Sequence, residues 1–151
     1  MNLAIWDIES SSASTDFGSI IEIGGILVDE NFKEKDRFNL RCRLPEGEVF
    51  QAMALIVNKT SIKQLTKTNL SHYQLLAEVE KIFKRWSPSI FLGWSNIGFD
   101  DEMIRKEFFK GVRYPYLTNA APNKRHDGIN IARAAYAIDP SILEVEFNEK
   151  N

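Results

Sequence analysis

Two carboxylates at the end of an apolar run are the first residues of this sequence that could do chemistry. Residues 3–8 are mostly apolar, and Asp7 and Glu9 stand two positions apart at the end of that run. Alternate side chains of a strand point to one face, so these two acids would project together. Burying them is costly unless something positive lies beside them, and carboxylate oxygens suit Mg²⁺ or Mn²⁺. The pattern indicates a divalent metal site, with a solvent-facing acidic pair as the alternative.

A second acidic site lies far along the chain. Asp100 follows Asn96 and Phe99, just after a short apolar segment and where a helix is expected to begin. Ligands of open α/β sheets gather in the crevice beyond the carboxyl ends of the strands, where a carboxylate at a helix start can meet one that leaves a strand. The alternative is that Asp100 only caps the helix and that Phe99 packs in the core. We predict that Asp7, Glu9 and Asp100 converge in one crevice.

Size and composition fit one globular domain over residues 1–151. The net charge of −2 argues against a large unspecific basic footprint on nucleic acid, but it leaves a small basic groove possible. Cys42 is the only cysteine, which excludes a disulfide framework. The sequence shows neither a signal-peptide pattern nor an apolar run of transmembrane length, so we expect a cytoplasmic protein without a membrane partner.

The hydrophobic pattern predicts an α/β fold that must position these acids. A strand ends at Glu9, and further strands are expected over residues 20–28, 36–44 and 90–94. Helices are expected to follow a capping box at Ser71 and Gln74, and to span residues 100–110 and 129–138. Gly24 and Gly25 inside the second strand predict a bulge or a close approach by another backbone.

The ordered set of motifs resembles the DEDD, or DnaQ-like, 3′–5′ exonucleases, which have a ribonuclease H-like fold. Three elements carry the resemblance: Asp7-x-Glu9, the segment 20–24, and Asn96-x-x-Phe99-Asp100. The longer segments 93–102, 114–116, 125–127 and 132–137 are similar to the exonuclease domain of the bacterial exodeoxyribonuclease I family. The likeness runs from about residue 3 to about residue 140.

The resemblance implies hydrolysis of phosphodiesters with two metal ions, Mg²⁺ or Mn²⁺, at the 3′ end of single-stranded DNA. Asp7 would bridge both ions, Glu9 would hold the ion that activates water, and Asp100 would hold the ion nearer the leaving group. Two ions about 4 Å apart clamp the attacking and leaving oxygens of an in-line displacement. By the same resemblance, the substrate would be bound by the following residues: Ser10, Leu55, Asn58, Asn96 and Phe99.

One motif of that family has no counterpart in the sequence. The family needs His-x-x-x-x-Asp on a late helix, where the histidine acts as the general base and the aspartate is the fourth metal ligand. Neither His72 nor His126 is followed by an acid at that spacing. Asp127 is instead expected to cap the helix that follows it. We therefore expect an exonuclease domain that is incomplete and C-terminally truncated. The open alternatives are a non-catalytic nucleic-acid-binding remnant and a fragment completed by a second polypeptide. The alternating apolar and acidic segment 142–147 could partly cover the face that a missing helix would leave open.

Overall fold

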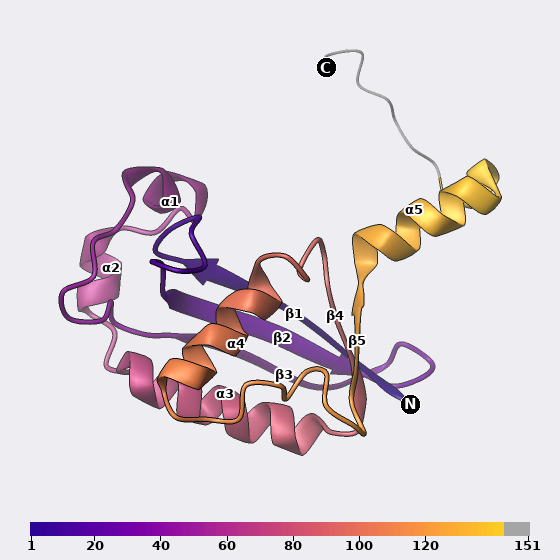
Figure 1. The fold of residues 1–151 in the computed structure, drawn as a ribbon, viewed down its shortest axis with the longest axis horizontal. Coiled ribbons are helices and arrows are strands. Elements are labelled where there is room, and N and C mark those ends of the chain that lie inside the picture. The colour runs from indigo at the N-terminus through magenta and orange to yellow at the C-terminus, as the bar shows by residue number, and fades with distance from the viewer. Residues whose placement is uncertain (144–151) are drawn as a thin grey trace, which may run out of the picture.

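A single five-stranded mixed sheet organises the molecule (Figure 1). The computed structural model describes residues 1–143. The strands are β1 (Asn2–Ser10), β2 (Ile20–Val28), β3 (Glu34–Arg41), β4 (Ser89–Gly93) and β5 (Lys124–Asp127). The helices are α1 (Ala52–Val57), α2 (Ile62–Thr66), α3 (His72–Trp86), α4 (Asp100–Lys110) and α5 (Gly128–Ile138), followed by a 3₁₀ turn (Pro140–Ile142).

The order of the strands places β1 at the centre of the sheet. Across the sheet they run β3-β2-β1-β4-β5. β1 and β2 pair antiparallel, as do β2 and β3, and this is the meander that the sequence predicts. β4 is parallel to both β1 and β5. Parallel neighbours need crossover connections, which α3 and α4 provide, and the predicted α/β class is confirmed.

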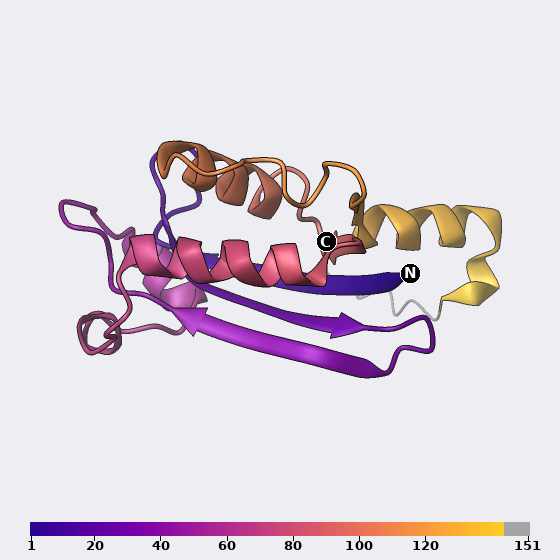
Figure 2. The same ribbon diagram turned by 90° about the horizontal axis from the view of Figure 1, so that it is seen from below.

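Only one face of the sheet is covered by the described residues. Figure 2 shows α3 and α4 on the same side of the strands. From Ala4 onwards the even residues of β1, among them Trp6 and Ile8, are buried under these helices, whereas Ile5 on the opposite face is 41% exposed. The strand alternation therefore separates a packed face from an open face, and Asp7 and Glu9 share the open face with Ile5.

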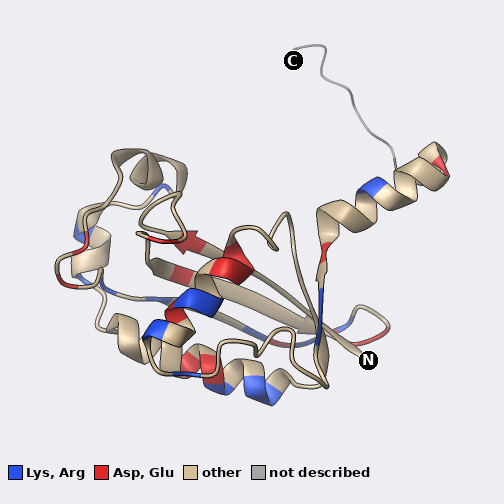
Figure 3. Cartoon of the chain, viewed as in Figure 1, with Lys and Arg blue, Asp and Glu red and all other residues tan. Residues whose placement is uncertain are grey.

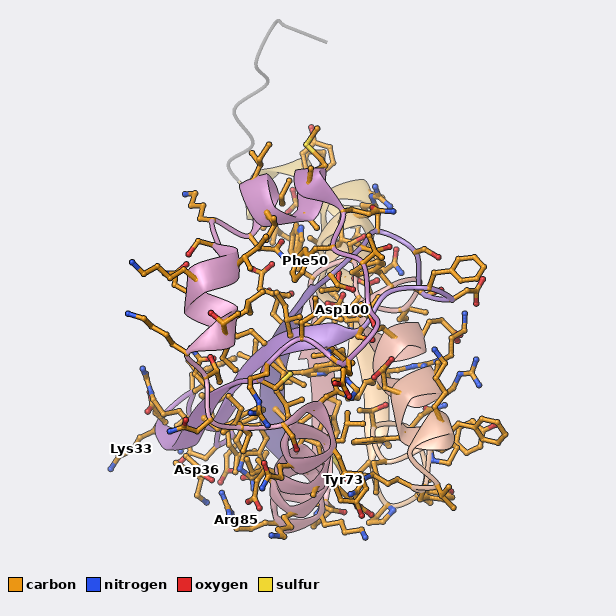
Figure 4. The ribbon with its side chains drawn as sticks, turned by 90° about the vertical axis from the view of Figure 1, so that its left-hand side faces the viewer. Lys33, Asp36, Phe50, Tyr73, Arg85 and Asp100 are labelled. Atoms are coloured by element: carbon orange, nitrogen blue, oxygen red, sulfur yellow. The ribbon has the colours of Figure 1, made fainter. Side chains whose placement is uncertain are left out.

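Aromatic packing fixes α3 against the meander. The Ser71 and Gln74 capping box predicted from the sequence begins this helix. At its other end the Trp86 indole N–H donates to Asp36 of β3 at 2.8 Å, and Arg85 pairs with the same carboxylate (Figure 4). A Cβ at Gly25 would lie 3.0 Å from the Ile5 carbonyl oxygen, so the predicted close approach by another backbone is found there. It would also lie 2.9 Å from the Phe38 ring and 3.2 Å from Trp86.

Several predicted boundaries need correction. The third strand ends at Arg41 rather than Leu44, because the Arg43 N–H donates to the carbonyl of Leu70 instead of continuing the ladder with β2. The short helices α1 and α2 and the strand β5 were not predicted. β5 reads Lys-Arg-His-Asp and carries no apolar alternation, so its pairing with β4 cannot be seen in its composition.

The last helix stands apart from the rest of the molecule. α5 points away from the sheet in Figure 1, and none of its residues is buried. It matches the helix predicted over 129–138, with Asp127 at its N-cap as expected. Most of the segment 142–147, predicted to cover an open face, lies outside the described residues. Within residues 1–143, no helix is both long and apolar enough to cross a membrane.

Candidate active site

Asp7 and Glu9 lie at the carboxyl end of the central strand, on the open face of the sheet. Across the β1–β2 ladder Asp7 is opposite Gly24 and Glu9 is opposite Glu22. Figure 3 shows the acidic segments of β1, β2 and the start of α4 gathered at this end of the sheet. The two acids therefore project together, as their spacing in the sequence predicts.

Asp100 reaches the same place from the first turn of α4. It is only 6% exposed, and its label in Figure 4 stands beside one end of this helix. Burial and, next, the negative charge of Asp7 raise the pKa of Asp100 to about 7, against a smaller opposing effect of a hydrogen bond with the Ile8 backbone. The N-cap position belongs to Phe99, so the alternative of Asp100 as a simple cap is wrong.

The charges of the three carboxylates are poorly compensated. Burial raises the pKa of Asp7 even though part of its side chain is open to solvent. Burial and the charges of Asp7 and Glu22 raise the pKa of Glu9, while Arg41 lowers it. Within residues 1–143 none of Asp7, Glu9 and Asp100 forms an ion pair.

Hard oxygen donors with raised pKa values and no cation partner fit Mg²⁺ or Mn²⁺. As the side chains lie, however, the described residues contain no group of three or more His, Cys, Asp or Glu side chains placed to hold one ion. The three carboxylates therefore lie in one region, where burial and the charge of Asp7 raise the pKa of the other two. Their side chains are not placed to coordinate one ion together.

The neighbouring Asp101 carboxylate, unlike Asp100, is held by hydrogen bonds from side chains. It is 1% exposed and accepts hydrogen bonds from the Asn96 side-chain amide at 3.1 Å and the Thr118 hydroxyl at 3.1 Å. The Arg125 guanidinium lies 3.6 Å away. Burial still raises the pKa of Asp101 to about 6. Asn96, predicted to contact substrate, is buried and holds Asp101 instead, so the structure places it in the support of the α4 N-terminus.

Asp127 joins the loop before Asp100 to the last helix. One of its oxygens accepts the Ile129 N–H at 3.0 Å and the Ser95 N–H at 2.9 Å. The predicted cap is thus confirmed, and the second bond ties residues 95–99 to β5. The sequence gives no sign of that second bond, because Ser95 and Asp127 are 32 positions apart.

The other predicted substrate contacts fall in two different places. Ser10, Asn58 and Phe99 line a cavity of about 270 Å³ beside Glu9. The Asn58 side-chain amide donates to the Ser10 carbonyl at 2.8 Å, which ties this segment to the end of β1. Leu55 lines a separate groove near α2, so it does not join this set.

Neither histidine of the chain lies among the three acids. His72, the first residue of α3, pairs with the buried carboxylate of Glu107 on α4 at 2.6 Å. His126 is exposed on β5, which is separated from β1 by β4. A general base next to Asp7 is therefore not supplied by a histidine within residues 1–143.

The five-stranded mixed sheet and its helices have the ribonuclease H-like fold. Among solved structures, "ExoI/SSB-Ct complex" matches with a TM-score of 0.91 at 20% identity, over 99% of this chain and 33% of that one. E. coli exonuclease I in complex with a dA16 oligonucleotide matches with the same score, identity and coverage. At this identity the likeness shows the fold, and the predicted ribonuclease H-like class is confirmed.

The curated proteins that match by sequence are exodeoxyribonuclease I of several bacteria. That of Buchnera aphidicola subsp. Schizaphis graminum is 23% identical over 151 residues, and that of Haemophilus influenzae is 25% identical over 147 residues. The chain spans about a third of their length, 31% in both cases. No protein-family model matches. The predicted resemblance to the exonuclease domain of bacterial exodeoxyribonuclease I is confirmed.

Proposed function

We propose that this chain is the exonuclease domain of a metal-dependent 3′–5′ exonuclease of the cytoplasm, which releases nucleoside 5′-monophosphates from single-stranded DNA. One observation carries the proposal. The Asp100 carboxylate is buried beside Asp7, and burial together with the Asp7 charge raises its pKa to about 7, in a site without a cation partner among the described residues. A divalent cation supplies the positive charge that such a site needs.

In the proposed reaction Asp7, Glu9 and Asp100 would hold the metal, two ions of Mg²⁺ or Mn²⁺. When bound, such ions lower the pKa of water and stabilise the charge that develops on the attacking and leaving oxygens. The 3′-terminal nucleotide occupies the cavity of Ser10, Asn58 and Phe99 beside Glu9. Leu55 and Asn96 lie elsewhere, so they are not part of the proposed substrate contacts.

We expect metal binding to be weak, because three carboxylates attract a divalent cation less than four do and leave coordination positions to water. Calorimetric titration with Mg²⁺ and Mn²⁺ measures it, with Asp7→Asn as the matched variant that removes one charge and keeps the shape. Identical curves for the two proteins would place the metal elsewhere.

We also expect little or no nuclease activity from the chain alone. Loss of a general base typically costs about 10²–10⁴-fold in rate, and no His-x-x-x-x-Asp motif is present. The assay is the release of mononucleotides from a 3′-labelled single strand in Mn²⁺, with Asp7→Ala as control. Robust turnover that Asp7→Ala abolishes would show that another group acts as the base, and the site would be complete.

A second candidate is a domain completed by another polypeptide, and the open face of the sheet favours it. Leu3, Ile26, Ile90 and Leu92 are only partly buried around the exposed Ile5, in the rows before Asp7. A helix packed there would lie beside the three acids. Activity that appears only when a polypeptide with His-x-x-x-x-Asp is added would support it.

The non-catalytic alternative makes a different prediction. A remnant that only binds nucleic acid would retain single-stranded DNA without turnover in Mn²⁺, and its affinity would not change in Asp7→Asn. Binding that depends on Asp7 and on the divalent cation would exclude it.

A further inference from the structure

A trough of about 650 Å³ crosses the open face of the sheet beside Asp7 and Glu9. Gly24 lies in its floor, opposite Asp7 on one side and Asn39 of β3 on the other. A Cβ at Gly24 would meet its nearest heavy atom only at 3.7 Å, so the position has room for a side chain that it lacks. The hollow exists because a glycine stands in the middle of this row of the sheet.

The next row of the sheet carries a charged triplet across three strands. Glu9, Glu22 and Arg41 are in register on β1, β2 and β3. Like charges directly opposite each other on neighbouring strands are unfavourable, and Arg41 offsets the pair of acids from the far side. All three residues line the trough, so its β1 wall is acidic and its β3 wall is basic.

The Arg41 guanidinium forms hydrogen bonds along one edge, to Glu22. Its Nε donates to Oε2 of Glu22 at 2.7 Å, and its Nη2 donates to the same oxygen. No hydrogen bond within residues 1–143 engages its Nη1, and the side chain is 33% exposed. Glu22, at 16%, is the more shielded partner. The pair thus fixes the guanidinium on the wall of the trough and leaves donors available to a ligand.

Arg37 lines the same trough and provides the contrast. Its Nε and Nη2 donate separately to the two carboxylate oxygens of Glu34, at 2.7 and 2.5 Å. This pairing is with a neighbour on the same strand, whereas the Arg41 pair joins β2 to β3. At 66% exposure the Arg37 side chain is also less ordered by its surroundings.

We propose that the trough binds the sugar–phosphate backbone of the single strand, with Arg41 as the phosphate contact and Glu22 as the residue that positions it. The proposal rests on the proposed function and adds a binding site to it. A guanidinium fork matches a phosphate in geometry and charge, and the glycine floor lets a backbone approach the sheet closely. The acids of the β1 wall face the cations of the reaction, while the β3 wall faces the phosphate.

The test is the salt dependence of single-strand binding, measured by fluorescence anisotropy with a labelled oligothymidylate in Ca²⁺. Each phosphate neutralised on a single strand contributes a slope of about −0.7 to the plot of log K against log salt. Arg41→Ala should reduce the magnitude of the slope by about 0.7 and weaken binding about tenfold. Arg37→Ala removes the same charge from the same trough and should change the slope clearly less. Equal slopes for the two variants would overturn the proposal.

Two further variants separate binding from folding. Arg41→Lys keeps the charge but not the fork, so the slope should stay near that of the unchanged protein while affinity falls several-fold. Gly24→Val adds a strand-compatible side chain to the floor and should abolish binding without lowering the melting temperature. Unchanged affinity in Gly24→Val would show that the strand does not use the trough.

The role of Glu22 is tested by a double-mutant cycle. If Glu22 positions Arg41, the loss of affinity caused by Arg41→Ala should shrink in a Glu22→Gln background. Additive effects would overturn the positioning role. If the unchanged protein binds no single strand in Ca²⁺, the proposed function and this site are both wrong. If it binds through Asp7 while Arg41→Ala has no effect, only the site is wrong.

Discussion

Asp100 is the carboxylate of the site whose negative charge most lowers the stability of the folded protein. The pKa of Asp100 is about 7 in the folded chain, against its ordinary value of 3.8 in the unfolded chain. Between these two pH values the folded state therefore binds more protons than the unfolded state. Stability therefore falls as pH rises from about 4 to about 7, and the loss is complete above pH 7. We expect Asp100→Asn to flatten this dependence and to stabilise the metal-free chain at pH 8 by on the order of 2 kcal/mol.

Thermal melts in EDTA between pH 5 and pH 8 measure this effect. Asp16→Asn is the control, because the Asp16 pKa is lowered by Lys106 and its removal cannot relieve an unfavourable charge. Addition of Mn²⁺ should raise the melting temperature of the unchanged protein more than that of Asp100→Asn. A melting temperature that falls in Asp100→Asn at pH 8 would contradict the assignment of this carboxylate as an uncompensated charge.

At the scale of elements, Asp127 is the joint between β5, α5 and the loop that leads to Asp100. Its one carboxylate oxygen satisfies the Ser95 and Ile129 amides. Asp127→Ala removes a helix cap and leaves the Ser95 amide without its partner, so we expect a loss of about 2 kcal/mol in urea unfolding. Asp139→Ala is the matched control, since Asp139 caps only the exposed 3₁₀ turn. If Asp127→Ala lowers the free energy of unfolding no more than Asp139→Ala does, Asp127 does not connect these elements.

At the scale of the whole molecule, the sheet has one packed face and one open face. Ile8 is 6% exposed under the helices, whereas Ile5 on the open face is 41% exposed. Ile8→Ala should cost about 2–5 kcal/mol, and Ile5→Ala should cost less than about 1 kcal/mol. Urea unfolding compares the two, and a hydrophobic dye should bind the unchanged chain. Equal costs, together with no dye binding, would mean that the Ile5 face is covered in solution.

Much of the candidate site follows from local pattern. Asp7 and Glu9 share a face because strand alternation is a property of the extended backbone itself. The capping box at Ser71 and the cap at Asp127 are also local, since each side chain bonds an amide two or three residues away. Such features depend on near neighbours in the chain, so the sequence specifies them before any tertiary contact forms.

The sequence by itself determined the α/β order of the elements, the acids at the end of the first strand and the resemblance that their spacing carries. Only the tertiary structure decided that Asp100 faces Asp7 while Asp101 faces Asn96, and that Arg41 meets Glu22 across the meander. These contacts join residues on different elements, and which side chains meet depends on strand register and helix rotation. A shift of one residue in a strand turns every side chain to the other face, so such pairings are settled by packing of the whole sheet rather than by any single segment.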